Sequence, residues 1–116
     1  MNSDKVYLVT RADLKPGQQA VQAAHALTEF IFQHDEQAKR WKAESNTLVM
    51  LAVKDEDSLN AMIEKGLQRG VRLSPFYEPD LGDALTAVAF EPGDVSFRLC
   101  SGIPLALRAN LPELET

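Results

Sequence analysis

Four short runs of mostly apolar residues divide the chain and predict four β-strands. The runs 5–10, 47–54 and 84–90 are apolar at nearly every position, which is typical of strands covered on both faces. The run 47–54 is the strongest of them, and we expect it to lie in the centre of the sheet. The run 71–78 contains Pro75, which predicts an edge strand or a bulge because proline cannot donate a backbone hydrogen bond.

Two segments with helical spacing separate the first strand from the second. Along the segment 17–34, apolar residues recur at three- and four-residue steps and should face the sheet: Ala20, Ala23, Ala24, Leu27, Phe30 and Ile31. A separate polar face carries Gln18, Gln22, His25 and Glu29. The charged segment 35–45 continues as a second helix with Trp41 as its apolar anchor, and Asn46 ends it.

The second half of the chain carries one more long helix and a short one. The acidic segment 55–58 is suited to cap the long helix, and Gly70 is suited to end it. The apolar stripe of this helix is Leu59, Met62, Ile63 and Leu67. The remaining predictions are a short helix from Asp94 to Leu99, a packed apolar segment 103–107 and a frayed end 108–116.

This order of elements predicts an α/β fold, a three-layer sandwich in which a mixed four-stranded sheet is flanked by helices. The two helical crossovers predict parallel strand pairs. The short connection 79–83 predicts an antiparallel pair for the last two strands. A length of 116 residues is typical of one domain, 1–116, with a core of about 5–107.

Composition narrows the classes of protein. The net charge of −5 argues against broad, nonspecific binding of nucleic acid, although a small local basic site is compatible with it. The longest apolar run, 48–53, is too short to span a membrane. The polar start of the sequence runs directly into the first predicted strand, so we expect no secretory signal. Cys100 is the only cysteine, so we expect a packed thiol, no internal disulfide and a cytoplasmic location.

The polar residues that follow the predicted strands are the candidates for chemistry, because sites in open α/β sheets gather beyond the carboxyl ends of parallel strands. We expect one shared rim there, made by Arg11, Asp13, Lys15, the helix start at Gly17, and Glu78 to Asp80. His25 lies further along the helix. Each residue also fits a structural role taken alone: an ion pair between Arg11 and Asp13, a permissive turn at Gly17, or a surface imidazole.

Several familiar signatures are absent. The chain has no phosphate-binding Gly-x-x-x-x-Gly-Lys-Ser/Thr loop, no Gly-x-Gly-x-x-Gly and no Gly-x-Ser-x-Gly. The two histidines, His25 and His34, have no other ligands near them at metal-binding spacing, so we expect no structural metal.

The segment from the first strand into the first helix resembles the type 2 peptidyl-tRNA hydrolases. Their signature is a strand that ends Arg-x-Asp-Leu, a glycine- and lysine-rich turn, and a helix with Ala-x-Gln-x-x-His-Ala. The matching residues here are Arg11, Asp13, Leu14, Gly17, Ala20, Gln22, His25 and Ala26. The strand 48–55 and the run 86–92, which carries Thr86, are also similar to the family, so the resemblance covers roughly 5–107.

This resemblance implies hydrolysis of the ester that joins a peptide to the terminal ribose of tRNA, without metal or other cofactor. The partner would be the acceptor end of peptidyl-tRNA. Catalytic roles are implied for His25, for Thr86 and for a carboxylate at Glu78 or Asp80. We assign substrate and tRNA binding to Arg11, Asp13, Lys15, Gly17 and Gln22. Family members are often dimers, so a homodimer through the apolar positions near Trp41 or 103–107 is one option.

The turn before the helix departs from the family's pattern. The family's Gly-Lys-Gly-Lys run is shortened here to Gly17-Gln18, which contains no lysine. Lys15 and Arg11 lie beside the turn and could supply the positive charge. Three functions therefore stay open: a peptidyl-tRNA hydrolase, a catalytically inactive member of the same fold that binds tRNA or a protein, and a hydrolase of small esters.

Overall fold

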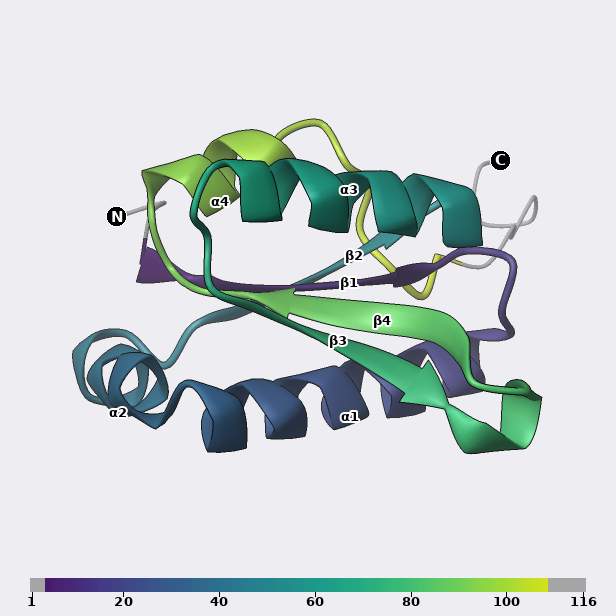
Figure 1. The fold of residues 1–116 in the computed structure, drawn as a ribbon, viewed down its shortest axis with the longest axis horizontal. Helices are drawn as coiled ribbons and strands as arrows, with labels where there is room; N and C mark the ends of the chain where they lie inside the picture. Colours follow the sequence, from purple (N-terminus) through teal and green to yellow (C-terminus); the bar gives the residue numbers. More distant parts are fainter. Residues whose placement is uncertain (1–3, 109–116) are drawn as a thin grey trace, which may run out of the picture.

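The computed structural model describes residues 4–108 and shows a four-stranded sheet between two layers of helices (Figure 1). In chain order the elements are β1 (Val6–Arg11), α1 (Pro16–Gln33), α2 (Asp35–Glu44), β2 (Leu48–Val53), α3 (Glu56–Gln68), β3 (Leu73–Glu78), the 3-10 helix η2 (Pro79–Leu81), β4 (Ala84–Phe90) and α4 (Asp94–Cys100). Every predicted strand and helix is present. The predicted frayed end 108–116 lies, apart from Arg108, outside the described residues.

The strand order in the sheet is β2-β1-β4-β3, so β1 and β4 are central. β1 runs parallel to β2, with Val6 opposite Leu48, and antiparallel to β4, with Tyr7 opposite Phe90. β3 pairs antiparallel with β4. The predicted mixed sheet is confirmed, as are the final antiparallel pair and the edge position of the strand that contains Pro75.

The prediction that the second strand is central is wrong, because β2 lies at an edge of the sheet. The C-terminal segment explains its apolar character. The N–H of Ala52 donates to the oxygen of Pro104 at 3.0 Å. The N–H of Ala106 donates to the oxygen of Met50 at 2.9 Å. This segment covers the outer side of β2 as a further strand would, and the predicted packing of 103–107 is confirmed.

The second helical crossover also differs from the prediction. α3 carries the chain from β2 at one edge of the sheet to β3 at the other, so these two strands are not neighbours. β3 runs in the same direction as β1 and β2, because each of the pairings β1 with β4 and β4 with β3 is antiparallel. The carboxyl ends of β1, β2 and β3 therefore lie at one end of the sheet, where the expected rim should be.

Helices cover both faces of the sheet. α1 and α2 lie on one face, while α3 and α4 lie on the other (Figure 1). On the first face, Phe30 and Trp41 pack in a core that includes Leu8 of β1. On the second face, Leu59 of α3 packs in a core that includes Phe90 of β4. Removal of these apolar side chains from water is the main stabilising contribution in such a fold.

The buried face of α1 is rotated from the predicted stripe. Ala24 and Ile31, which were expected to be buried, are exposed. Gln19 and Gln22 are buried instead, each with 5% of its surface exposed. The pattern misled because Gln22 was assigned to the polar face and Gln19 to no face, whereas buried amides are stable when they are hydrogen-bonded. Leu67 of α3 is likewise exposed rather than buried.

Cys100 lies in the core, as predicted. The Cys100 thiol is buried, and its burial raises its pKa to about 12, so it packs as a small apolar group. Within residues 4–108, the helices are either too short or too polar to cross a bilayer.

Candidate functional site

A buried amide on α1 joins two residues that the sequence marked as candidates. Gln22 donates a hydrogen bond from Nε2 to Oε1 of Glu78 on β3 at 3.0 Å. Its Oε1 accepts a hydrogen bond from Oγ1 of Thr86 on β4 at 2.7 Å. An ionised carboxylate can only accept, so Glu78 fixes which end of the amide faces it. The three side chains come from three separate elements and form one hydrogen-bonded set.

A β-bulge aims Thr86 at this set. Phe76 of β3 lies opposite Ala87, but the next residue, Tyr77, lies opposite Leu85. Thr86 is therefore the extra residue on β4. Strict alternation would place it on the same face as Val88, which packs in the core beneath α3. The bulge turns its side chain to the α1 face instead, as bulges beside functional sites often do. Thr86 is completely buried, and its hydroxyl bonds the Gln22 amide rather than solvent.

His25 lies one helical turn after Gln22 and stacks on Phe76. The ring centroids are 4.4 Å apart and the ring planes differ by 13°. Face-to-face contact with Phe76 limits the rotation of the imidazole but leaves its nitrogens at the ring edge. His25 is exposed, so these nitrogens can meet a substrate in solution. Phe76 could not be identified as a site residue from the sequence, because a phenylalanine in a strand is usually a core residue.

Glu78 is held as a carboxylate. The hydrogen bond from Gln22, the hydrogen bond from the N–H of Asp80 and the nearby charge of His25 lower the pKa of Glu78 below its ordinary value of 4.5, in that order of importance. Hydrogen bonds to the charged form have this effect in general. The carboxylate of Asp80 is exposed and is not part of the set. Of the two alternatives, Glu78 is thus the carboxylate that contacts the α1 residues.

Arg11 and Asp13 lie apart from this set. The guanidinium of Arg11 makes two hydrogen bonds to the carboxylate of Asp13, at 3.0 and 2.9 Å, and a third to the oxygen of Leu85 at 3.0 Å. Its Nη1 lies 3.9 Å from Oε1 of Glu56 on α3. The expected ion pair is therefore present, and Arg11 is directed toward the protein rather than toward solvent.

Lys15 and Gly17 are at the start of α1, with Lys15 at the N-cap position. Within residues 4–108 no side chain caps this helix end, so its first N–H groups are free for an anion. Gly17 lies inside the first turn, and a Cβ added to it would meet no atom within 4 Å. Its backbone is not left-handed, so the expectation that it supplies a permissive turn is wrong. The start of α1 lies at the same end of the molecule as the segment that joins β3 to β4 (Figure 1).

Gln19 is a second buried amide, and it was not among the candidates from the sequence. Its Nε2 donates to the oxygen of Leu14 at 2.8 Å, and its Oε1 accepts from the N–H of Leu107 at 3.2 Å. Gln19 thus ties the turn before α1 to the C-terminal segment. The signal that could have found it is its spacing of three and four residues from Gln22 and Ala23, on the face that packs against the sheet.

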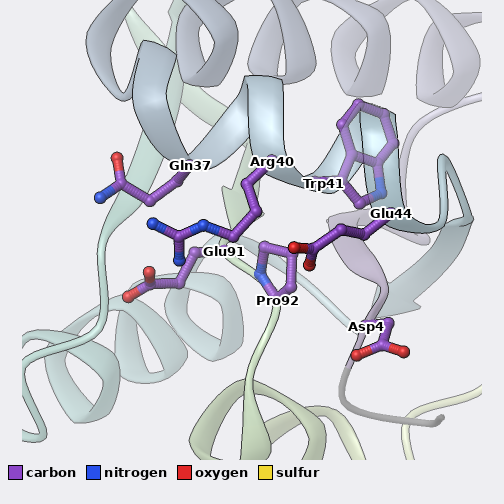
Figure 2. Close-up of a pocket in the computed structure, with 7 residues that line it drawn as sticks. All are labelled: Asp4, Gln37, Arg40, Trp41, Glu44, Glu91 and Pro92. Atoms are coloured by element: carbon purple, nitrogen blue, oxygen red, sulfur yellow. The ribbon is translucent and has the colours of Figure 1, made fainter.

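Two hollows among the described residues lie away from this set. A small pocket of about 60 Å³ lies beside α2, and Figure 2 shows Arg40 and Trp41 on one side of it and Glu91 and Pro92 on the other. It is too small for an organic ligand. A larger apolar hollow of about 580 Å³ lies between α3 and the C-terminal segment. Lys54 lines it, together with Ala12 of the segment that leads into α1. Among the described residues, no three histidine, cysteine or carboxylate side chains form a metal site.

Comparison with known proteins identifies the family. The family model described as "Peptidyl-tRNA hydrolase PTH2" matches residues 4–96. A solved structure of a protein of unknown function from Agrobacterium tumefaciens has a similar fold, with a TM-score of 0.63 and 14% sequence identity over 87% of this chain and 96% of the other. No curated protein matches. Because the family model spans most of the chain, and the chain carries His25 and Gln22 at the positions of the motif, the protein belongs to the peptidyl-tRNA hydrolase PTH2 family.

Proposed function

We propose that this protein hydrolyses the ester between a peptide, or an N-blocked aminoacyl group, and the terminal ribose of tRNA, and so releases free tRNA. The observation that supports this best is the connected set of Gln22, Glu78 and Thr86 with His25 beside it. Family membership supports the substrate class. The set joins a carboxylate to an amide donor, and the exposed imidazole of His25 lies one helical turn from that amide.

The chemistry follows from the needs of ester hydrolysis. A water molecule must lose a proton as it attacks the carbonyl carbon, and the oxygen that gains negative charge must meet hydrogen-bond donors. We assign proton transfer to His25, because imidazole is the side chain best suited to this near neutral pH. Glu78 accepts a hydrogen bond from the attacking water and orients it. The proton later passes to the ribose oxygen as the ester bond breaks.

Gln22 supplies the oxyanion donor in this proposal. A carboxamide nitrogen carries two hydrogens, and only one is used in the bond to Glu78. The second can point at the substrate. Thr86 is a positioning residue rather than a group that touches the ester, because its buried hydroxyl donates to Gln22. The tRNA phosphates would meet Lys15 and the free N–H groups at the start of α1.

The test is release of the acyl group from N-acetyl-aminoacyl-tRNA by the purified protein in low salt with EDTA. His25→Ala should lower kcat by about 10²-fold or more, the usual contribution of a catalytic acid or base. His34→Gln is the matched control, since His34 lies at the far end of α1 with its Nε2 3.2 Å from the oxygen of Leu73, and glutamine can still donate there.

The outcomes separate the alternatives. Acyl release that depends on His25 supports the hydrolase. If the wild-type protein binds the tRNA but releases nothing, the protein is a binding member of the family. If it hydrolyses a small ester as fast as the tRNA ester, with no salt dependence, then the tRNA is not its substrate. Full turnover by His25→Ala would reject the mechanism assigned here.

A further inference from the structure

The backbone of β4 continues past the point where β1 stops pairing with it. The β1–β4 ladder ends with Thr10 opposite Ala87, so Thr86 and Leu85 have no backbone partner on β1. Both residues are buried, with 0% and 2% of their surface exposed. Peptide groups at such positions need hydrogen-bond partners, because water cannot supply them.

Three side chains supply those partners in place of a strand. The carboxylate of Glu56 on α3 accepts a hydrogen bond from the N–H of Leu85 at 2.9 Å. Nη1 of Arg11 donates to the oxygen of Leu85 at 3.0 Å. The hydroxyl of Thr10 donates to the oxygen of Thr86 at 2.8 Å. Within residues 4–108, side chains thus hold the backbone of the bulge on its β1 side.

Arg11 is itself held in place. Its Nε and Nη2 bond both oxygens of Asp13, and only 15% of its side chain is exposed. A planar guanidinium that makes a paired contact with a carboxylate has a fixed orientation. The remaining nitrogen, Nη1, is thereby aimed between Leu85 and Glu56.

We infer that Arg11 and Glu56 are positioning residues that fix the β4 bulge and so aim the Thr86 hydroxyl at Gln22. The inference rests on the proposed function, in which Gln22 meets the substrate. It gives Arg11 a role different from the tRNA binding expected from the sequence. The two residues act through Leu85 and Thr86, and neither touches the ester.

The test compares three variants with N-acetyl-aminoacyl-tRNA as the substrate. Arg11→Met and Glu56→Leu remove the partners of Leu85, and we expect kcat to fall by about 10²-fold, as for a small misplacement of a reacting group, with KM within about twofold. Glu56→Gln keeps an oxygen that can accept from Leu85, and its kcat should stay within about fivefold of wild type, since only an exposed charge contact is lost. Lys39→Met, which breaks an exposed pair on α2, is the control.

A second readout does not depend on turnover. Amide exchange measured by NMR should show a faster rate at Leu85 in Glu56→Leu and an unchanged rate in Glu56→Gln. The Thr86 methyl resonance should shift in Arg11→Met and in Glu56→Leu, but not in Glu56→Gln. If the wild-type protein proves inactive, the proposed function fails while these measurements still decide the inference. A raised KM with normal kcat in Arg11→Met, or equal effects of Glu56→Leu and Glu56→Gln, would overturn it.

Discussion

The amide nitrogen of Gln22 lies 3.0 Å from Oε1 of Glu78, although 56 residues separate them in the sequence. The bond brings a helix on one face of the sheet against the last residue of an edge strand. It also couples the charge of Glu78 to the orientation of Gln22, since a carboxylate only accepts hydrogen bonds and so the NH₂ group of the amide must face it. The protonation of one residue therefore depends on the identity of the other.

Gln22→Glu should raise the pKa of Glu78. The substitution removes the donor that does most to lower this pKa and places a second carboxylate beside the first, so the charged form is disfavoured twice. The check is an NMR titration of the Glu78 side-chain carboxyl. Gln18→Glu, an exposed change on the same helix, is the control and should move the pKa little. An unchanged pKa in Gln22→Glu would mean that the bond does not persist in solution.

Glu78 should make stability depend on pH at the acid end. Its folded-state pKa is lower than its ordinary value of 4.5, so the unfolded chain binds more protons there. The stability it contributes is present above 4.5 and is lost as the pH falls through the lower folded-state pKa. We expect the urea midpoint to fall less on acidification in Glu78→Gln than in wild type. If both proteins lose stability in parallel, other carboxylates account for the loss.

The layers of the fold were predictable because apolar runs and helical spacing indicate which side chains are buried. Most of the buried side chains in this protein lie in those runs and stripes. The strand order was not predictable, because β2 and the central strands are equally apolar. β2 is as apolar as a central strand because the segment with Pro104 and Ala106 covers its outer side. The sequence does not indicate which edge of the sheet a terminal segment covers.

The site was predictable in part for a similar reason. The motif located His25 and Gln22 on one helix, and the position of Glu78 after a strand placed it at the rim. The burial of Gln22 and the direction of Thr86 were not predictable. The burial of Gln22 depends on the rotation of α1 about its axis, which the apolar spacing did not predict. The direction of Thr86 depends on a bulge that contacts of Leu85 with residues far away in the chain hold in place.

Phe76→Leu should lower kcat through its effect on His25. The stack with the imidazole at 4.4 Å limits the orientations of the ring, and aromatic pairs of this kind contribute about 0.5–1.5 kcal/mol. Loss of the stack should therefore reduce kcat by about two- to tenfold, less than loss of the imidazole. Tyr77→Leu changes the neighbouring, exposed residue of β3 and should keep kcat. Equal losses in both variants would point to a general disturbance of β3.

Two glycines should respond in opposite ways to alanine. Gly17→Ala adds a Cβ that meets no atom within 4 Å inside a helix, so it should stabilise the protein by about 0.4–1 kcal/mol. In Gly66→Ala the new atom would lie 2.8 Å from Leu73 and 3.1 Å from Phe90, which should destabilise it by about 1–3 kcal/mol. Chemical denaturation measures both. A destabilised Gly17→Ala would contradict the helical placement of Gly17.

Lys15→Ala should weaken tRNA binding in a way that salt reveals. Arg11 is occupied by Asp13 and Leu85, which leaves Lys15 as the cation at the start of α1 that can meet a phosphate. Removal of one phosphate contact lowers the slope of log Kd against log salt by about one. The measurement is tRNA affinity at several salt concentrations, with Lys39→Ala on α2 as the control. If Lys15→Ala keeps the wild-type slope, the phosphates are met elsewhere, and the shortened turn has lost this contact altogether.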